Sequence, residues 1–220
     1  MNPQLTLKNF DREYLTQYLV RQIHNVIPDG LDPTPEIEAH IDEALGRLHV
    51  CINAIKCWPQ NTFDSFHSTQ YCTFVYYLAN TIWRRTHDPA VPLRLFLLNK
   101  ALNGIDCFYE IELPEVFFIG HSVGIVLAKA SYGNHLVLYQ NCTVGKNHGT
   151  APILEDGVIL YPNSTIIGNC RVRQGSVIAQ GVSVINRDTE PNRIAFQGSD
   201  GTLVFKSSGH NILSDFFRDT

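Results

Sequence analysis

Hydrophobic residues recur with a helical period in the first half of the chain. Between Asp11 and Ile27 they lie mostly three or four positions apart, which places them on one face of an α-helix. They are Tyr14, Leu15, Tyr18, Leu19 and Ile23. A second helix is predicted to open at Thr34-Pro35, because threonine caps helix N-termini and proline is well tolerated in the first turn.

Two more helices are predicted before residue 105. One runs from about Ser65 to Arg85, and the other follows Asp88-Pro89, where the same capping signal precedes the segment LRLFLLNKALNG. Gly104 is expected to end the last helix, because glycine readily adopts the left-handed conformation found at helix C-termini. Residues 1–104 are therefore predicted to form an α-helical domain.

The second half repeats every six residues. From Leu154 onward each sixth residue is aliphatic, a small residue follows it four places later, and glycine or asparagine follows it three places later. The sixth-residue series is Leu136, Cys142, His148, Leu154, Leu160, Ile166, Val172, Ile178 and Val184. The small residues are Val158, Ser164, Cys170, Ser176 and Val182. The glycines and asparagines are Gly157, Asn163, Asn169, Gly175 and Gly181.

A period of six is typical of a coil with three short sides, and neither an α-helix nor a two-faced strand repeats in this way. The aliphatic residue points inward, the small residue fits near a corner, and glycine or asparagine makes the turn with positive φ. Upstream the period continues one residue out of phase, and a five-residue step from Ser131 to His135 joins the two phases. The upstream series is Cys107, Leu113, Ile119, Ile125 and Ser131.

The pattern predicts an N-terminal α-helical domain followed by a left-handed parallel β-helix of hexapeptide repeats over residues 105–186. A C-terminal tail, residues 187–220, follows, with a possible short strand at Thr202 to Lys206. The polar segment from Lys146 to Pro152 interrupts the repeat, because His148 stands where an aliphatic residue is due. We expect this segment to leave the coil as a loop, and such interruptions are where binding surfaces tend to form.

Composition narrows the expected partners and location. The 220 residues carry a net charge of −4 with no block of like charges, so neither nucleic acid nor a membrane surface is expected as a partner. The N-terminus lacks a secretory signal pattern, and no apolar run approaches the roughly 18 residues of a membrane span. The six cysteines form no CxxC pair, which predicts free thiols in a cytoplasmic protein.

Several motifs resemble one enzyme family. The segment GHSVGIV at 120–126 is similar to the Asp-His-Ala-Thr-Gly-Ile-Val segment of the serine acetyltransferases, and Asp106 precedes His121 by the fifteen residues that separate their catalytic pair. The segment LYQNCTVG at 138–145 resembles the stretch that leads into their glycine-rich loop. The chain thus resembles the serine acetyltransferase family of hexapeptide-repeat acyltransferases over roughly residues 60 to 206.

The resemblance implies an acetyl-CoA-dependent O-acetyltransferase acting on L-serine or a similar small acceptor. His121 would be the general base, and Asp106 would orient its ring from the adjacent rung. The resemblance also implies acceptor contacts from Gly120, His67 and His148. A helix cap at Asp64 or Ser65 explains the polar residues near His67 equally well.

Two departures from the family leave the acceptor open. Gly120 stands where the family has an aspartate that contacts the amino-acid substrate. Thr150-Ala151-Pro152 replaces an Arg-His-Pro expected to hold the serine carboxylate. The acceptor is therefore either serine or another alcohol such as a sugar.

The resemblance also implies how the cosubstrate binds. Acetyl-CoA would lie along the outside of the coils between neighbouring subunits of a homotrimer or a dimer of trimers, and no metal is expected. The residues expected to meet it are Gly145, Pro162, Gln180, Gly181 and Lys206.

Three alternatives remain. The same scaffold supports O- or N-acetylation of a sugar. A zinc hydratase of carbonic-anhydrase type would need His121, His135 and His148 together at a subunit interface. A non-catalytic assembly scaffold would need neither Asp106 nor His121.

Overall fold

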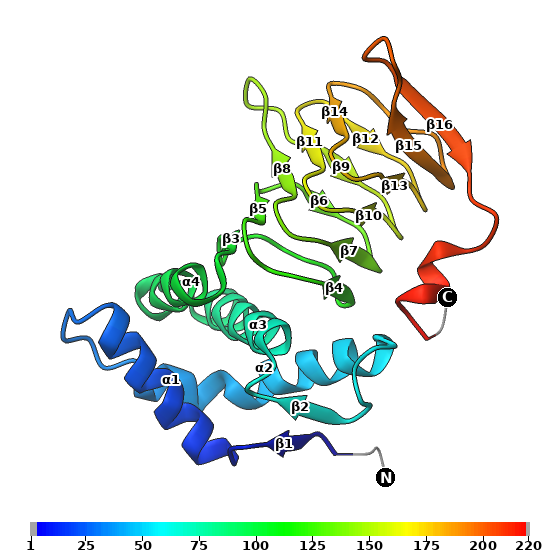
Figure 1. Ribbon diagram of the computed structural model, residues 1–220. Coiled ribbons are helices and arrows are strands. Elements are labelled where there is room, and N and C mark those ends of the chain that lie inside the picture. The colour runs from blue at the N-terminus through cyan, green and yellow to red at the C-terminus, as the bar shows by residue number, and fades with distance from the viewer. Residues whose placement is uncertain (1–3, 219–220) are drawn as a thin grey trace.

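A bundle of helices is followed by a stack of short parallel strands (Figure 1). The computed structural model describes residues 4–218. The helices of this range are α1 (Arg12–Val26), α2 (Thr34–Ala54), α3 (Ser68–Thr86) and α4 (Ala90–Asn103). Two short strands, β1 (Thr6–Lys8) and β2 (Thr62–Asp64), pair in parallel beside the helices. No helix among the described residues is long and apolar enough to cross a bilayer.

The helices begin and end at residues with local capping signals, except that α2 begins differently from the prediction. The Asp11 carboxylate accepts a hydrogen bond from the Tyr14 N–H and caps α1, and Gly104 ends α4 in the left-handed conformation, as predicted. Thr34 is not the cap of α2. It is the first helical residue, and the Asp32 carboxylate accepts from its N–H at 3.0 Å. The N-cap residue is Pro33, which has no side-chain cap bond, and Asp32 instead forms an Asx turn with the residue two places further on.

The strands form three parallel sheets that are the three sides of the coils. The first sheet contains β4 (Phe117–Ile119), β7 (Leu136–Leu138), β10 (Ile159–Leu160), β13 (Val177–Ile178), β15 (Arg193–Gln197) and, antiparallel at its edge, β16 (Leu203–Ser207). The second contains β3 (Asp106–Cys107), β5 (Val126–Leu127), β8 (Thr143–Gly145), β11 (Thr165–Ile167) and β14 (Ser183–Ile185). The third contains β6 (Ser131–Tyr132), β9 (Ile153–Leu154) and β12 (Arg171–Val172). The predicted helical domain followed by a parallel β-helix is confirmed.

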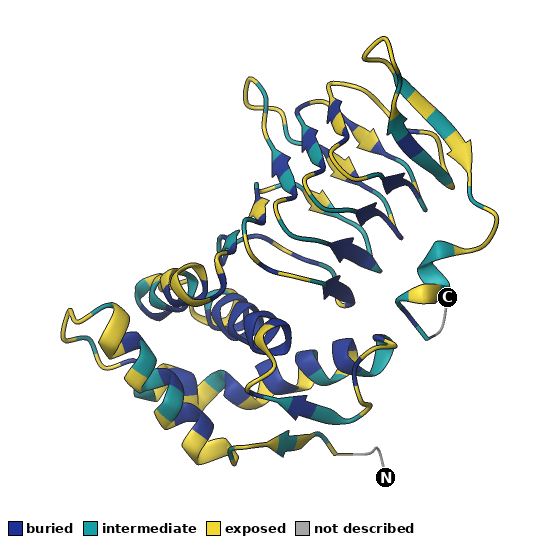
Figure 2. Ribbon diagram, in the orientation of Figure 1, coloured by how far each residue is buried: buried dark blue, intermediate teal, exposed yellow. Residues whose placement is uncertain are grey.

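Every member of the six-residue series from Leu154 to Val184 is buried, and β7, β10 and β13 are dark blue in Figure 2. Directly upstream of the loop the predicted phase is wrong, whereas Cys107 and Ile119 of the earlier series are buried and pair with Leu127 and Leu138. Leu138, not Leu136, pairs with Leu160, and Val144, not Cys142, pairs with Ile166. Since the loop lengthens one coil, counting in sixes across it shifts the register upstream. Cys142 is instead buried at a corner, like Ser164.

The predicted turn residues mostly have the expected conformation. Positive φ angles are found at Gly157, Asn163, Gly175 and Gly181. At the remaining corner the left-handed residue is Gly168 (φ 83°) and not Asn169. A side chain at position 168 would overlap the Asn186 side-chain oxygen, so only glycine fits there.

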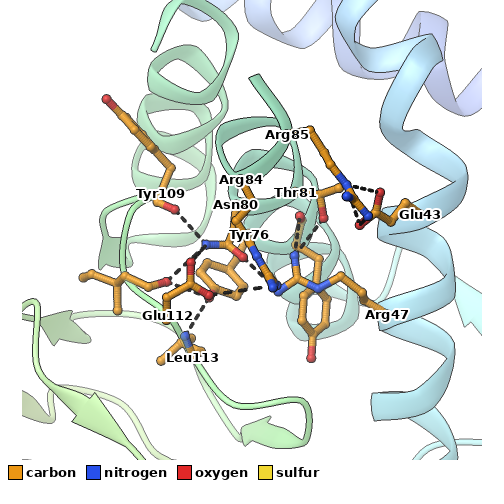
Figure 3. A network of polar contacts seen from close by, with 12 residues as sticks. Glu43, Arg47, Tyr76, Asn80, Thr81, Arg84, Arg85, Tyr109, Glu112 and Leu113 are labelled. Atoms are coloured by element: carbon orange, nitrogen blue, oxygen red, sulfur yellow. Dashed lines mark hydrogen bonds and ion pairs between the residues drawn. The ribbon is translucent and has the colours of Figure 1, made fainter. Parts of the chain in front are cut away.

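A buried polar network joins the helices to the first coil (Figure 3). Arg47 of α2 donates to the side chains of Asn80 (2.8 Å) and Thr81 (2.7 Å) on α3. The Asn80 amide donates in turn to the Tyr109 carbonyl at 3.0 Å. The Tyr76 hydroxyl donates to one backbone carbonyl of the coil and accepts from the Leu113 N–H. These bonds fix the orientation of the helices, because buried polar groups are costly when unpaired.

The C-terminal segment extends the first sheet and then returns to the helices (Figure 1). β15 pairs in parallel with β13, and β16 pairs antiparallel with β15 to form a hairpin. The predicted strand at Thr202 to Lys206 is present as β16, with both ends one residue later. After the short 3-10 helix η1 (Ile212–Asp215), the buried Phe217 pairs with Ile55. Arg218 donates to carbonyls that follow α2, including that of Trp58 at 2.6 Å.

Candidate active site

The turns that join the first sheet to the second stack into one ridge. We call residues 120–125, 139–142, 161–164 and 179–182 the turn column. Backbone hydrogen bonds link each turn to the one below: Asn141 N–H to Val123 O (2.9 Å), Asn163 N–H to Gln140 O (3.1 Å) and Gly181 N–H to Pro162 O (3.0 Å). The column is therefore a continuous surface along the coils.

His121 lies in the lowest turn of the column, and its side chain is exposed. The neighbouring Ser122 is buried, and its hydroxyl donates to the Asn103 carbonyl at 2.8 Å. At the other side of the turn, the Gly124 N–H donates to the Gly104 carbonyl at 2.9 Å. The turn that presents His121 is thus anchored to the end of α4, while the imidazole remains open to a ligand.

Asp106 lies on the adjacent coil. It is the first residue of β3 and pairs with Val126, and its N–H donates to the Ile125 carbonyl at 2.8 Å. Its carboxylate accepts from the Lys100 ammonium at 2.6 Å, and no hydrogen bond joins Asp106 to His121 within residues 4–218. The side chains of Lys100 and Asp106 are 52% and 37% exposed, so solvent screens the pair and makes it weak.

Sequence reasoning missed Lys100. It lies in the last turn of α4, where a cation interacts favourably with the helix C-terminus. The only sequence signal was its position six residues before Asp106.

Gly120 is packed against an aromatic ring. A Cβ atom at position 120 would lie 2.6 Å from Cε1 and 2.8 Å from Cδ1 of Tyr139. Tyr139 stacks on Tyr161 of the next coil, with ring centroids 5.6 Å apart and an interplanar angle of 24°. Each tyrosine directly follows an inward-pointing leucine, which is the signal that sequence reasoning did not use.

His67 is connected to the same region through aromatic contacts. Its ring meets Trp58 edge-on at 6.0 Å, Trp58 meets Phe118 at 5.8 Å, and Phe118 meets Tyr139 at 6.4 Å between centroids. The exposed His67 is the residue that precedes α3.

The alternative helix-cap explanation for this region is wrong. The Asp64 carboxylate accepts from the Phe66 N–H, ahead of the helix, and pairs with Lys8 at 2.7 Å. The Ser65 hydroxyl donates to the Lys8 carbonyl. Both side chains are therefore engaged with the segment around β1 and not with the N-terminus of α3.

Three of the five predicted cosubstrate residues lie on the turn column. Pro162 and Gly181 belong to its third and fourth turns, and Gln180 precedes Gly181. A Cβ at Gly181 would meet nothing within 4 Å, so the surface there is open. Gly145 lies instead at the far end of β8, and Lys206 on β16 has its ammonium 5.2 Å from the Phe196 ring centroid.

The predicted loop leaves the coil after β8, as Figure 1 shows. Asn147 and Thr150 exchange two backbone hydrogen bonds of 2.9 Å, and His148 and Gly149 between them both have positive φ. These are the features of a tight two-residue hairpin turn. His148 is exposed at the tip of this hairpin. The turn column joins the start of β8 and the loop follows its end, so His148 and His121 lie at opposite ends of this strand and are not brought together within one chain.

The three histidines of the zinc alternative are not grouped in the chain. His135 packs edge-on against the Phe217 ring, with centroids 5.0 Å apart, at the base of the coils. Across residues 4–218 no three histidine, cysteine or acidic side chains are placed to hold a metal ion. The six cysteines are free thiols, and Cys57 alone among them is exposed.

The architecture, helices followed by a parallel β-helix, is shared with solved serine acetyltransferases. Several serine acetyltransferases are among the solved structures similar to the chain. One in complex with CoA superposes with a TM-score of 0.70 at 17% identity, covering 86% of this chain and 83% of its own. The soybean enzyme complexed with serine has a TM-score of 0.63 at 19% identity, covering 86% and 84%. The Vibrio cholerae enzyme has a TM-score of 0.65 at 18% identity, covering 90% and 81%.

Sequence comparison gives the same family name. A Synechococcus elongatus serine acetyltransferase is 28% identical over 124 residues, which are 54% of this chain and 50% of that protein. The Bacillus subtilis serine acetyltransferase is 26% identical over 135 residues, which are 56% and 61% of the two chains. The chain spans about half the length of the curated relatives it matches. No protein-family model matches the chain. The predicted resemblance to the serine acetyltransferases is confirmed.

Proposed function

We propose that the chain is an acetyl-CoA-dependent O-acetyltransferase that acts on the hydroxyl of L-serine or a similar small acceptor. The observation that carries the proposal is the position of His121 on the same turn column as Pro162, Gln180 and Gly181, with Asp106 on the adjacent coil. The names of the relatives, and the solved neighbours bound to CoA and to serine, support it.

The proposed reaction is direct transfer. Neutral His121 removes the acceptor's hydroxyl proton as its oxygen attacks the thioester carbonyl. The new C–O bond forms, the C–S bond breaks, and the imidazolium returns the proton to the CoA thiolate. Asp106 orients the imidazole once its carboxylate leaves Lys100 and binds His121. Because the Lys100 ion pair is exposed and screened by solvent, breaking it requires little free energy.

The proposed cosubstrate path follows the turn column. Pantetheine would run along Pro162, Gln180 and Gly181, where the missing side chain of Gly181 permits close approach. Gly145 and Lys206 would meet other parts of CoA, and His67, Gly120 and His148 would line the acceptor side. His148 would do so only from a neighbouring subunit, because its loop points away from His121.

We infer a homotrimer or a dimer of trimers in the cytoplasm. Exposed apolar side chains on the coils, among them Val123 (64% exposed) and Ile185 (49%), support burial against another subunit. The free cysteines support a reducing compartment. We also propose the division into residues 1–104, 105–186 and 187–220.

His121→Ala tests the proposal. The variant should lose nearly all acetyl transfer, because no other base lies in its turn, while coenzyme A binding stays within about twofold of wild type. Release of free thiol from acetyl-CoA measures transfer with serine and other alcohols, and calorimetry measures binding. His24→Ala, an exposed histidine on α1, is the matched control and should keep full activity. Unchanged turnover in His121→Ala would refute the mechanism.

A further inference from the structure

The turn that carries His121 is longer than the other three turns of the turn column. It has six residues between β4 and β5, 120–125, whereas four residues join the strands in each of the other turns. The Ile125 N–H donates to the Ser122 carbonyl at 3.2 Å, and an equivalent bond closes each shorter turn directly after its first strand. The two additional residues are therefore Gly120 and His121, so the candidate base lies in a part of the turn that the stacked coils do not repeat.

Ser122 attaches this longer turn to α4. Its hydroxyl donates to the Asn103 carbonyl at 2.8 Å, and the Gly124 N–H donates to the Gly104 carbonyl at 2.9 Å. The last carbonyls of an α-helix have no partner within the helix, so the turn supplies donors that the end of α4 needs. Figure 1 shows α4 leading directly into β3 of the first coil. Because Ser122 is buried, its hydroxyl is not readily replaced by water.

The hydrogen bonds continue from α4 into α3. The Asn103 amide donates to the side-chain oxygen of Asn99 at 2.8 Å, and the Asn99 amide donates to the Cys72 carbonyl at 3.0 Å. Both asparagines are buried, where an unpaired amide is costly, so these bonds hold the end of α4 in one orientation. Since α3 begins directly after His67, the same bonds connect the turn of His121 to the helix that follows a predicted acceptor residue.

We infer that Ser122, Asn103 and Asn99 are positioning residues for His121, which they hold in place by fixing its turn to α4 and α3. The inference rests on the proposed acetyl transfer and assigns it residues that act through His121. A misplacement of a reacting group by about 1 Å costs up to about 100-fold in rate. Ser122 stands where the similar serine acetyltransferase segment has alanine, so the bond from its hydroxyl is a feature of this chain.

Ser122→Ala tests the first bond, because it removes one oxygen atom and leaves the backbone bonds of the turn in place. We expect kcat to fall about tenfold, with the affinity for coenzyme A and the KM for acetyl-CoA within about twofold of wild type. Thiol release with L-serine and other small alcohols measures kcat, and calorimetry measures coenzyme A binding. Thr16→Val on α1 is the matched control. It also removes a buried hydroxyl that donates to a backbone carbonyl, and it should keep kcat within about twofold.

Asn99→Ala tests the far end of the same set of bonds. This residue makes its hydrogen bonds to α3 and to Asn103, and kcat should still fall about three- to tenfold with coenzyme A affinity unchanged. Adding Ser122→Ala to Asn99→Ala should cost little more than the larger single loss, because residues of one hydrogen-bonded network are not additive. Losses that multiply in the double variant would show that the two residues act independently and would contradict the inference.

Hydrogen exchange tests the anchoring without catalysis. In Ser122→Ala the amides of segment 117–127 should exchange about tenfold faster than in wild type, while those of β10 and β13 stay unchanged. Equal exchange in this segment would overturn the inference. Wild-type turnover with unchanged kcat in both single variants would overturn it too and leave the proposed function standing, whereas no wild-type turnover with any acceptor would overturn both.

Discussion

At the residue scale, Asp106 has two possible partners. The structure pairs it with Lys100, whereas the proposed mechanism needs it to orient His121. Lys100 and the His121 ring are both exposed to solvent, so Asp106 loses little free energy when it changes from one partner to the other. Asp106 is therefore a positioning residue whose partner depends on what occupies the site.

Asp106→Asn should lower kcat by about 100- to 10,000-fold, because an amide stabilises the imidazolium less and permits the wrong tautomer. Lys100→Gln removes the competing cation and should leave kcat within about threefold of wild type. Steady-state kinetics with thiol detection measures both. A larger loss in Lys100→Gln than in Asp106→Asn would show that Lys100, not His121, is the functional partner.

Buried thiols make stability depend on alkaline pH. Burial raises the pKa of Cys51 from 9.0 to about 11 and of Cys72 from 9.0 to about 12. The unfolded chain therefore loses these protons first, so the stabilisation is full below pH 9 and is lost as pH rises toward 11. The free energy of unfolding should fall by about 1.4 kcal/mol per thiol per pH unit in that window. Urea unfolding at pH 8 and pH 10.5 measures it, and Cys51→Ala should reduce the slope.

At the element scale, the coils depend on turns between short strands. Each strand is two or three residues long in most coils, so the turn sets both the direction of the next side and its register. Glycine or asparagine at these corners adopts the left-handed conformation with little strain. The one projecting turn, at Asn147 to Thr150, is closed by its own hydrogen bonds and leaves the stacking of β8 on β11 intact.

Gly168→Ala should destabilise the chain by about 2 kcal/mol or more, because it combines a left-handed φ with overlap on the Asn186 side chain. Gly46→Ala on the exposed side of α2 is the control. It has open space and a helical conformation, and should stabilise by up to about 1 kcal/mol. Chemical denaturation of the two variants measures the difference. Equal stabilities would show that the corner at 168 tolerates side chains.

At the scale of the whole molecule, the helices and the coils are joined by polar groups as well as by the apolar core. Asn80 is fully buried between α2 and the first coil, where it accepts from Arg47 and donates to the Tyr109 carbonyl (Figure 3). The tail adds a second connection through Phe217 and Arg218. His121 and His67, which come from the two halves, keep their relative positions because of these connections.

Asn80→Leu should lower the free energy of unfolding by about 2–4 kcal/mol, because it leaves the Tyr109 carbonyl without its partner and removes one of the acceptors of Arg47, which keeps Thr81. Thermal unfolding by calorimetry measures the loss. Gln17→Leu on α1, whose amide makes only an exposed contact with Glu13, is the control and should change stability by less than about 0.5 kcal/mol. A similar small effect in Asn80→Leu would show that the network does not join the two halves.

The helices, the coil and most of its corners were predictable because each depends on residues close together in sequence. Inward positions such as Leu160 and Ile166 are set by a period of six, and a helix end such as Gly104 by its own conformation. The predicted phase at Leu136 and Cys142 failed because the loop changes the number of residues in one coil, which a fixed count cannot detect. Lys100 was missed because a single exposed lysine carries no pattern.

By itself, the sequence determined the two-part architecture, the similarity to the serine acetyltransferases, and the choice of His121 and Asp106 as candidates. Only the tertiary structure decided what lies against them. Gly120 meets Tyr139 nineteen positions away, and Tyr139 stacks on Tyr161 a further coil along. These contacts join residues of successive coils. They therefore depend on how the strands of one coil align with those of the next, which is set by the number of residues in each turn and loop. The physical reason is that the six-residue period fixes which way a side chain points, whereas its neighbour depends on how the coils stack.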